Sequence, residues 1–351
     1  MINQLMIYGA NGYTAQLIIE LAVKVGIKPI LAGRNKRKIQ PIAKRFDLPY
    51  RIFDLQNPRA IDDAISDIEV VLHCAGPYIH TAKPMVEACI RNMAHYLDIT
   101  GEIDVFELIQ SYDYEAKKKA VMLLPGCGFD VVPTDCMAKY LSEQLPDATH
   151  LSLAFASKGG GLSHGTAMTA IENLGEAGKI RLDGQIVNRP IGHQTKALRF
   201  GTEFKSFGVT IPWRDVSTAF YSTEIPNIQV FLGVPQHNAK YIQLQSKFNW
   251  LLKMDFVKKI AKAIVNAQMT GPDKKTRQRS KAYVWGEVKN AKGQTKSAYF
   301  STLETYTLTA VMAVRIAQKV LDKNFKIGFQ TPSNAYGWRL ITEIEETRFG
   351  V

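Results

Sequence analysis

The sequence has little of several features that would place it in a specialised class. It has only four cysteines in 351 residues and no CxxC pair, which excludes a disulfide scaffold and argues against a structural zinc site. No apolar run approaches the roughly 20 residues that a membrane-spanning helix needs. The turn that begins at Gly9 arrives before a signal-peptide core could form. We therefore expect a cytoplasmic protein without a metal site.

Acidic residues are also scarce relative to basic ones. The chain carries 44 Lys and Arg against 32 Asp and Glu, so its formal charge is 44 − 32 = +12. This excess favours anionic partners, such as phosphorylated cofactors, a membrane surface or nucleic acid. The cations are spread out except at Lys253–Lys262 and Lys274–Lys281, and no RRM, zinc-finger or homeodomain pattern accompanies them. We expect no nucleic-acid partner.

The first third of the chain alternates short apolar strands with helical stretches. Strands are predicted over residues 5–8, 29–32, 50–53, 69–74, 95–98 and 120–124. This spacing predicts βαβ units and hence a doubly wound α/β domain, a parallel sheet with helices on both faces. Runs such as VVLHC are apolar throughout, as strands buried on both faces should be.

The rhythm changes after Pro133. Residues 185–234 are rich in Val, Ile, Thr, Gly and Pro at short intervals, which predicts an antiparallel or mixed sheet. Helices are predicted over 166–177 and 306–323, one or two helices over 248–269, and a hairpin with its turn at Gly293. We expect a nucleotide-binding domain over 1–134 and an α+β substrate and dimerisation domain over 135–303, with 304–351 packing back on the first.

Gly9-x-x-Gly12-x-x-Ala15 lies between the first strand and the first helix. A glycine there can take a positive φ, and a missing side chain lets a pyrophosphate approach the backbone and the helix N-terminus. Such a motif also occurs in ordinary tight turns. Here it opens a βαβ chain, which favours a dinucleotide site.

The residues after the second strand indicate which dinucleotide binds. An NAD site usually has Asp or Glu at that point, whereas this chain has Ala32-Gly33-Arg34-Asn35. Arg34 can pair with a 2′-phosphate, a charge-assisted contact of roughly 1.5–3 kcal/mol. The alternative is a solvated loop arginine. We predict NADP.

Four side chains are candidates for lining a substrate cleft. Tyr78 and Asp98 follow neighbouring strands at the carboxyl edge, where doubly wound sheets bind ligands, and Cys127 follows the last core strand. His164 opens a helix of the second domain. Tyr78 or His164 could deliver a proton, although packing and capping are the commoner roles, and structural use is favoured for Cys127. The nicotinamide is expected near Gly76-Pro77, with the second domain as the opposite wall.

Several segments together resemble one family. GANGYTAQL, LAGRN, VVLHCAGPY, VEACIRNMAHYLDITGE and PGCGFDVVPTDCMAKYL look like successive motifs of the saccharopine dehydrogenase-like oxidoreductases. SHGTAM, GPDKKTRQRS, TYTLTAVMAVRIAQKVL and GFQTPSNAYG resemble the branch that includes the bacterial trans-acting enoyl reductases. The resemblance runs in order from the first strand to about Gly337.

The resemblance implies a Rossmann domain, then an α+β domain, and hydride transfer to or from an activated C=C or C=N bond of a small or lipid-like substrate. His164 departs from the small residues common in the corresponding turn. Cofactor-binding positions are implied at Gly9, Asn11, Gly12, Tyr13, Thr14, Arg34, Asn35, Asp54, Cys74, Ala75, Gly76 and Pro77.

Two other functions fit the sequence. A saccharopine-type amino-acid dehydrogenase would need cations that grip several carboxylates, which the positive charge allows. A catalytically weak scaffold at a membrane surface is suggested by Phe248–Lys262, an apolar stretch with lysines at its end, as interfacial helices have. A helix docked on its own domain is the simpler explanation of that stretch, so peripheral membrane contact is not our first expectation.

Overall fold

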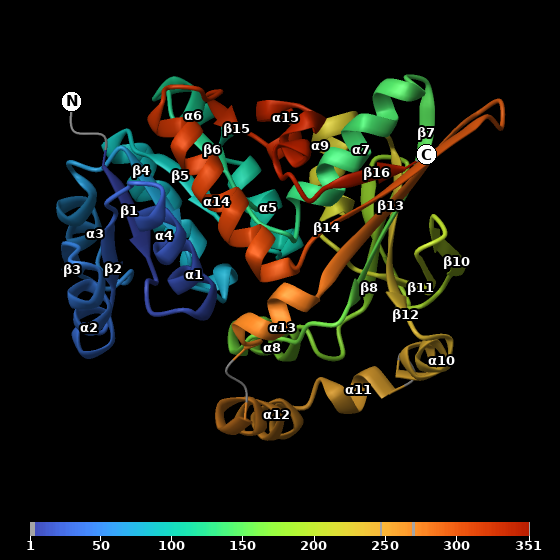
Figure 1. Ribbon diagram of the computed structural model, residues 1–351, viewed down its shortest axis with the longest axis horizontal. Coiled ribbons are helices and arrows are strands. Elements are labelled where there is room, and N and C mark those ends of the chain that lie inside the picture. Colours follow the sequence, from blue (N-terminus) through green and yellow to red (C-terminus); the bar gives the residue numbers. More distant parts are fainter. Residues whose placement is uncertain (1–3, 246–247, 269–270, 351) are drawn as a thin grey trace. The chain divides into compact units, whose positions relative to one another are not determined.

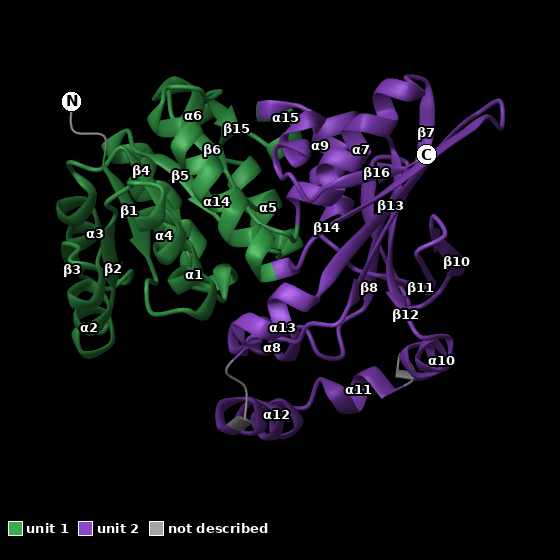
Figure 2. Ribbon diagram, viewed as in Figure 1, with its two compact units in different colours: residues 1–130, 306–335 green, residues 131–305, 336–351 purple. Residues whose placement is uncertain are grey.

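The computed structural model describes residues 4–245, 248–268 and 271–350 (Figure 1). The chain divides into unit 1, residues 1–130 with 306–335, and unit 2, residues 131–305 with 336–351 (Figure 2). The first boundary therefore lies four residues before the predicted one. The expected return of 304–351 to the first domain is right only for 306–335, because β16 (Arg348–Gly350) pairs with β14 (Thr295–Leu303) in the sheet of unit 2.

Unit 1 contains a seven-stranded parallel sheet in the order β15-β6-β5-β4-β1-β2-β3. The chain runs outward from β1 to β3 and then returns to place β4 beside β1. This reversal is the switch point at which doubly wound sheets bind ligands, so the predicted fold class is confirmed. The strands are β1 (Leu5–Tyr8), β2 (Ile30–Gly33), β3 (Tyr50–Ile52), β4 (Val70–His73), β5 (His95–Asp98), β6 (Met122–Leu124) and β15 (Gly328–Phe329).

Helices pack against this sheet, and the hydrophobic core is formed by buried residues of the strands and the helices. Every residue of β1, β2, β4 and β5 is buried, as the continuous apolar runs predicted. Strand β15 was not predicted, since two residues are too few to show a pattern. The helices are α1 (Tyr13–Lys24), α2 (Lys36–Phe46), α3 (Pro58–Ile65), α4 (Tyr78–Asn92), α5 (Ile103–Gln110), α6 (Asp113–Lys118), α14 (Thr305–Leu321) and α15 (Pro332–Tyr336).

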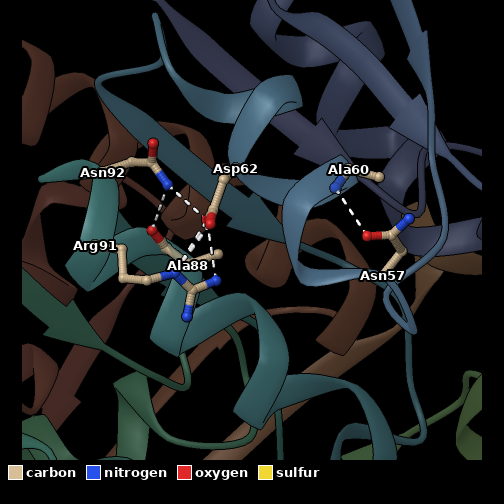
Figure 3. Close-up of polar contacts among 6 residues, drawn as sticks. All are labelled: Asn57, Ala60, Asp62, Ala88, Arg91 and Asn92. Atoms are coloured by element: carbon tan, nitrogen blue, oxygen red, sulfur yellow. Dashed lines mark hydrogen bonds and ion pairs between the residues drawn. The ribbon is translucent and has the colours of Figure 1, made fainter.

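A polar clamp joins α3 to α4 (Figure 3). The Asp62 carboxylate accepts hydrogen bonds from the Arg91 guanidinium at 2.9–3.2 Å and from the Asn92 amide at 2.8 Å. At the start of α3, the Asn57 side chain caps the helix by accepting from the Ala60 N–H. Because the ion pair is partly exposed, it contributes at most about 1 kcal/mol and mainly fixes how the two helices meet.

Unit 2 contains a mixed sheet in the order β10-β11-β12-β7-β13-β14-β16, with a β8–β9 hairpin paired to β12. Strands β12 and β7 are parallel and the other pairs are antiparallel, so the predicted mixed sheet and hairpin at Gly293 are confirmed. The remaining strands are β7 (Ala148–Lys158), β8 (Gly178–Leu182), β9 (Gln185–Arg189), β10 (Thr195–Phe200), β11 (Phe204–Ile211), β12 (Asn227–Val234) and β13 (Lys281–Asn290).

The helices of unit 2 agree only in part with the sequence prediction. The stretch 248–269, predicted as one or two helices, is two helices, and residue 269 lies outside the described ranges. The helices over Gln236–Gln245 and Lys274–Arg279 were not predicted. Helix α9 was missed because its small and hydroxyl residues are buried on most sides and show no amphipathic period. Within the described ranges, no helix is long and apolar enough to cross a bilayer. The helices are α7 (Val132–Gln144), α8 (His164–Glu172), α9 (Asp215–Thr223), α10 (Gln236–Gln245), α11 (Asn249–Leu252), α12 (Asp255–Gln268) and α13 (Lys274–Arg279), with a 3₁₀ helix over Trp338–Glu343.

Candidate functional site

The glycine turn after β1 lies directly against the end of β4. Gly9 has φ +83°, and its N–H donates to the Ala32 carbonyl at 2.8 Å. A Cβ at Gly9 would lie 2.7–2.8 Å from Ala75 and from the carbonyl carbon of Cys74. Only glycine fits both the backbone conformation and this space. The turn is therefore held at the switch point between β1 and β4.

Gly12 has a different task from Gly9. Its φ of −66° suits any residue, and a Cβ there would lie 3.3 Å from the Gly9 oxygen and 3.7 Å from the Cys74 oxygen. It is the N-cap of α1, with no side chain to cap the helix, and the first turn carries no acid. The positive end of the α1 dipole is thus left for an anion from outside, which suits a pyrophosphate.

The end of β2 opens onto a cationic hollow of about 490 Å³. Its lining residues are Arg34, Asn35, Lys36, Arg37 and Asp54. Helix α2 begins there, its N-cap Asn35 makes no side-chain capping bond, and cations occupy its first turn. Each cation at a helix N-terminus is disfavoured by about 0.3–1 kcal/mol. A bound 2′-phosphate would reverse this cost, so these residues fit the phosphate that distinguishes NADP from NAD.

A third helix end at the same edge of the sheet is already capped by the protein. Helix α4 begins after the cis peptide Gly76-Pro77, and the Glu102 carboxylate accepts from the backbone N–H groups of Tyr78 at 2.8 Å and Ile79 at 2.9 Å. This end therefore offers less to a phosphate than α1 and α2 do. Sequence analysis missed Glu102, which lies 24 residues from its partner; the HYLDITGE motif was the only signal.

Tyr78 is a core residue rather than an exposed acid. Its side chain is 8% exposed, its ring meets His73 edge-on, and its hydroxyl donates to the His73 carbonyl at 3.2 Å. Burial, together with nearby acidic groups, raises the pKa of the Tyr78 hydroxyl well above its ordinary value of 10. The geometry favours the packing role that the sequence left open, and a catalytic role for Tyr78 stays a prediction.

Asp98 ties together the ends of β5 and β6. It is fully buried, and its Oδ1 accepts from the backbone N–H groups of Thr100 at 2.9 Å and Gly126 at 2.8 Å. Its Oδ2 accepts from the Tyr96 hydroxyl at 2.8 Å, and its main-chain carbonyl accepts from the Cys127 N–H at 2.7 Å. Burial raises the pKa of the Asp98 carboxyl to about 7, and the hydrogen bonds oppose this rise.

Cys127, a predicted candidate, and His73, which was not predicted, both lie next to Asp98 and make hydrogen bonds within the chain. The Cys127 thiol is buried and donates to the Leu124 carbonyl, and burial raises its pKa well above 9, so it stays protonated. His73, at the end of β4, bonds Thr81 through Nε2, and burial lowers its pKa to about 3, so it is neutral. No group of three or more potential ligands within the described ranges is arranged to hold a metal ion.

His164 belongs to unit 2, whereas Tyr78, Asp98 and Cys127 belong to unit 1. It is the first residue of α8, and Ser163 before it caps the helix by accepting from the Thr166 N–H. Its Nε2 lies 2.7 Å from Oδ1 of Asn266 on α12, and the side chain is half-buried. Of the four candidates, the three in unit 1 therefore lie in the same unit, and His164 does not.

Residues 5–124, which span β1 to β6, match the family model of the saccharopine dehydrogenase NADP binding domain. This stretch of unit 1 is therefore similar in sequence to the NADP-binding domain of the saccharopine dehydrogenases. The predicted cofactor is thereby confirmed as NADP, and the resemblance inferred from the sequence is confirmed with it.

Known proteins support the same assignment. The human saccharopine dehydrogenase-like oxidoreductase is 27% identical over 245 residues, which cover 61% of this chain and 57% of the relative. The trans-acting enoyl reductase of Mycobacterium ulcerans is 27% identical over 146 residues, 39% of this chain and 35% of that protein. This chain thus spans about half the length of the curated relatives, or less. The apo saccharopine dehydrogenase (L-Glu forming) of Saccharomyces cerevisiae shares the fold over 99% of both chains, with a TM-score of 0.67 and 13% identity.

Replacing Arg34 with Ala should weaken NADPH binding about tenfold to a hundredfold, because a charge-assisted contact to the 2′-phosphate is lost. NADH binding should hardly change. Isothermal titration with both cofactors measures this, with Lys44→Ala in the last turn of α2 as the matched loss of one positive charge. A wild-type protein that prefers NADH would contradict the assignment of this hollow.

Gly12→Val should abolish NADPH binding and leave the fold intact, since the backbone there suits any residue and only the space above the α1 N-terminus is filled. Gly9→Val is the contrasting variant. It forces a Cβ into the backbone of β4 at a positive φ and should unfold unit 1. Circular dichroism and cofactor titration separate the two outcomes. Undiminished binding by a folded Gly12→Val protein would move the pyrophosphate elsewhere.

Asp98 should make stability fall as the pH rises from about 4 to about 7. In that window the folded chain keeps a proton that the unfolded carboxyl, with its pKa near 3.8, has released, so the free energy of unfolding is greatest at the acid end. Asp98→Asn cannot titrate and lacks this contribution. Urea titrations across the window should show the wild-type advantage over the variant shrinking as the pH rises. A constant or growing advantage would refute the raised pKa.

Proposed function

We propose that the protein is an NADP-dependent oxidoreductase that transfers a hydride to or from an activated C=C or C=N bond. The observation that carries this proposal is that two helix N-termini at the switch point have no capping side chain and no acid in their first turn. The α1 end is left uncapped by Gly12, the α2 end is lined with cations, and both lie in a domain that matches an NADP-binding family. The residues present fit the cofactor.

Each part of this edge has a distinct task in holding the cofactor. The Gly9–Gly12 turn and the α1 N-terminus bind the pyrophosphate, and Arg34, Lys36 and Arg37 bind the 2′-phosphate. The segment Cys74–Pro77, which is pressed against Gly9, lies where the ribose and nicotinamide end is expected. NADP supplies or accepts the hydride when it is bound. Asp98 keeps the β5 and β6 ends in place by accepting three hydrogen bonds.

His164 is the better candidate for a proton donor. Tyr78 and Cys127 are buried and donate to main-chain carbonyls, so neither is free to serve a substrate. The His164 imidazole is partly exposed and is oriented by Asn266. A histidine side chain can act as a general acid.

The reacting bond is proposed as C=C of a small or lipid-like substrate, because of the motifs shared with the enoyl-reductase branch and the named relative. The likeness to the yeast saccharopine dehydrogenase is one of fold, so saccharopine is a competing substrate to be tested. NADPH oxidation against enoyl thioesters, imines and saccharopine, each with its reverse reaction, decides among them. Absence of turnover on the whole panel would favour a cofactor-binding scaffold. A homodimer and a cytoplasmic location stay predictions.

His164→Gln should lower turnover about a hundredfold or more, the usual contribution of a general acid, without changing NADPH affinity. Glutamine keeps a hydrogen-bond donor for Asn266 but cannot deliver a proton. Tyr78→Phe is the companion variant. It loses one hydrogen bond to a main-chain carbonyl and should retain most of the turnover. Wild-type turnover by His164→Gln would exclude this donor, and a large loss in Tyr78→Phe would restore the catalytic role first considered for Tyr78.

A further inference from the structure

The exposed apolar side chains of this protein are concentrated in one segment of unit 2. Seventeen large apolar side chains are exposed in the described part of the chain, and nine of them fall between Tyr241 and Ile264. Scattered exposed apolar residues are normal on a monomer, whereas a contiguous group marks an interaction surface. We name as the α11–α12 face the exposed side chains of Phe248, Trp250, Met254, Phe256, Ile260 and Ile264.

Helix α12 has one wide apolar face, and only one side of that face is docked on unit 2. On its inner side, Val265 is buried with Ile171 of α8, and Lys262 forms an ion pair with Glu172 at 2.6 Å. This is the docking on its own domain that the sequence suggested. That docking does not use the other side. A surface helix normally has one apolar stripe and a polar outer face.

The outer part of this apolar face carries an exposed stripe. Phe256, Ile260 and Ile264 recur at every fourth residue, so they line one side of the helix, and they are 51%, 57% and 53% exposed. Trp250 of the neighbouring helix α11 is 69% exposed. Figure 1 shows α11 and α12 at the outer edge of unit 2, with α8 next to α12. No part of the described chain covers these four side chains.

The part of the sequence that contains most of the α11–α12 face, and the residues that follow it, are rich in positive charge. Residues 253–281 contain nine Lys and Arg against two Asp, so this stretch carries 9 − 2 = +7 of the net +12. Lys253 and Lys262 pair with acids of the neighbouring Glu172–Glu176 segment. Lys259 of α12 and Lys274, Lys275 and Arg279 of α13 are exposed. An exposed apolar stripe within a strongly cationic segment matches a surface that is apolar inside and anionic outside.

We propose that the α11–α12 face binds unit 2 to the surface of an anionic phospholipid bilayer. The aromatic and aliphatic side chains enter the boundary between headgroups and acyl chains, and the surrounding cations contact lipid phosphates. A second copy of the chain fits less well, because it would bring another +7 against the first. This inference is independent of the proposed redox activity and would place the protein next to a lipid-like substrate.

The test is cosedimentation of the full chain with vesicles of phosphatidylglycerol and phosphatidylcholine in equal parts, and with vesicles of phosphatidylcholine alone. The wild type should bind the anionic vesicles more tightly, and raised salt should weaken that binding. Phe256→Gln, Ile260→Gln and Ile264→Gln combined should reduce partitioning about a hundredfold, because three apolar side chains no longer enter the bilayer. Lys274→Gln, Lys275→Gln and Arg279→Gln combined should reduce binding to the anionic vesicles about tenfold or more.

A matched control replaces three exposed apolar residues of unit 1 by Gln, namely Val25, Tyr114 and Ile327. It should sediment like the wild type, and an unchanged circular dichroism spectrum and thermal unfolding of each variant show that both units are folded. Failure of the wild type to bind anionic vesicles, or equal binding by the α12 variant, overturns the proposal. So does a wild-type dimer that the α12 substitutions dissociate, since the face would then bind a second copy.

Discussion

The contact between Gly9 and the backbone of Cys74–Ala75 is the constraint on which the nucleotide-binding edge depends. Strands β1 and β4 are far apart in sequence and adjacent in the sheet, and the turn after one is pressed against the segment after the other. A side chain at Gly9 would push these two segments apart. The same contact aims α1 at the switch point and holds Cys74–Pro77 beside it, so cofactor binding and sheet packing share one position.

Three helix N-termini lie at the same edge of the sheet, and they differ in the charged groups around them. The α4 end is neutralised by Glu102, the α1 end is bare because its N-cap is glycine, and the α2 end carries Lys36 and Arg37 where acids would be more stable. A chain selected only for stability would cap all three in the same way. The departure at α1 and α2 is the reason for proposing that the phosphates of NADP bind at these two ends. Asp98 shows the opposite strategy, a buried carboxyl whose hydrogen bonds are all supplied by the chain.

Unit 2 has exposed apolar side chains that the packing of its own fold does not require. Its mixed sheet, with α7 and α9 packed beside it, needs no contribution from α11 or the outer side of α12. The inner side of α12 already satisfies the packing requirement through α8, so the outer stripe has no structural purpose within the described chain. Hydrophobic residues are costly to keep exposed unless something covers them. The two units thus present two chemically distinct surfaces, one cationic for a nucleotide and one apolar with a cationic border.

The sequence by itself determined those features that depend on neighbours along the chain. The period of apolar residues predicted the strands and helices of unit 1, the glycine spacing predicted the tight turn after β1, and the missing acid after β2 together with Arg34 indicated NADP. Only the tertiary structure decided what depends on residues far apart. Glu102 caps a helix that starts 24 residues earlier, Asp98 joins β5 to Gly126, and the final residues pair with β14 in unit 2. The sequence could not reveal which side of α12 is covered, or that the Tyr78 hydroxyl points to a main-chain carbonyl. Burial and hydrogen-bond partners are properties of the folded surroundings, and a local pattern carries no record of them.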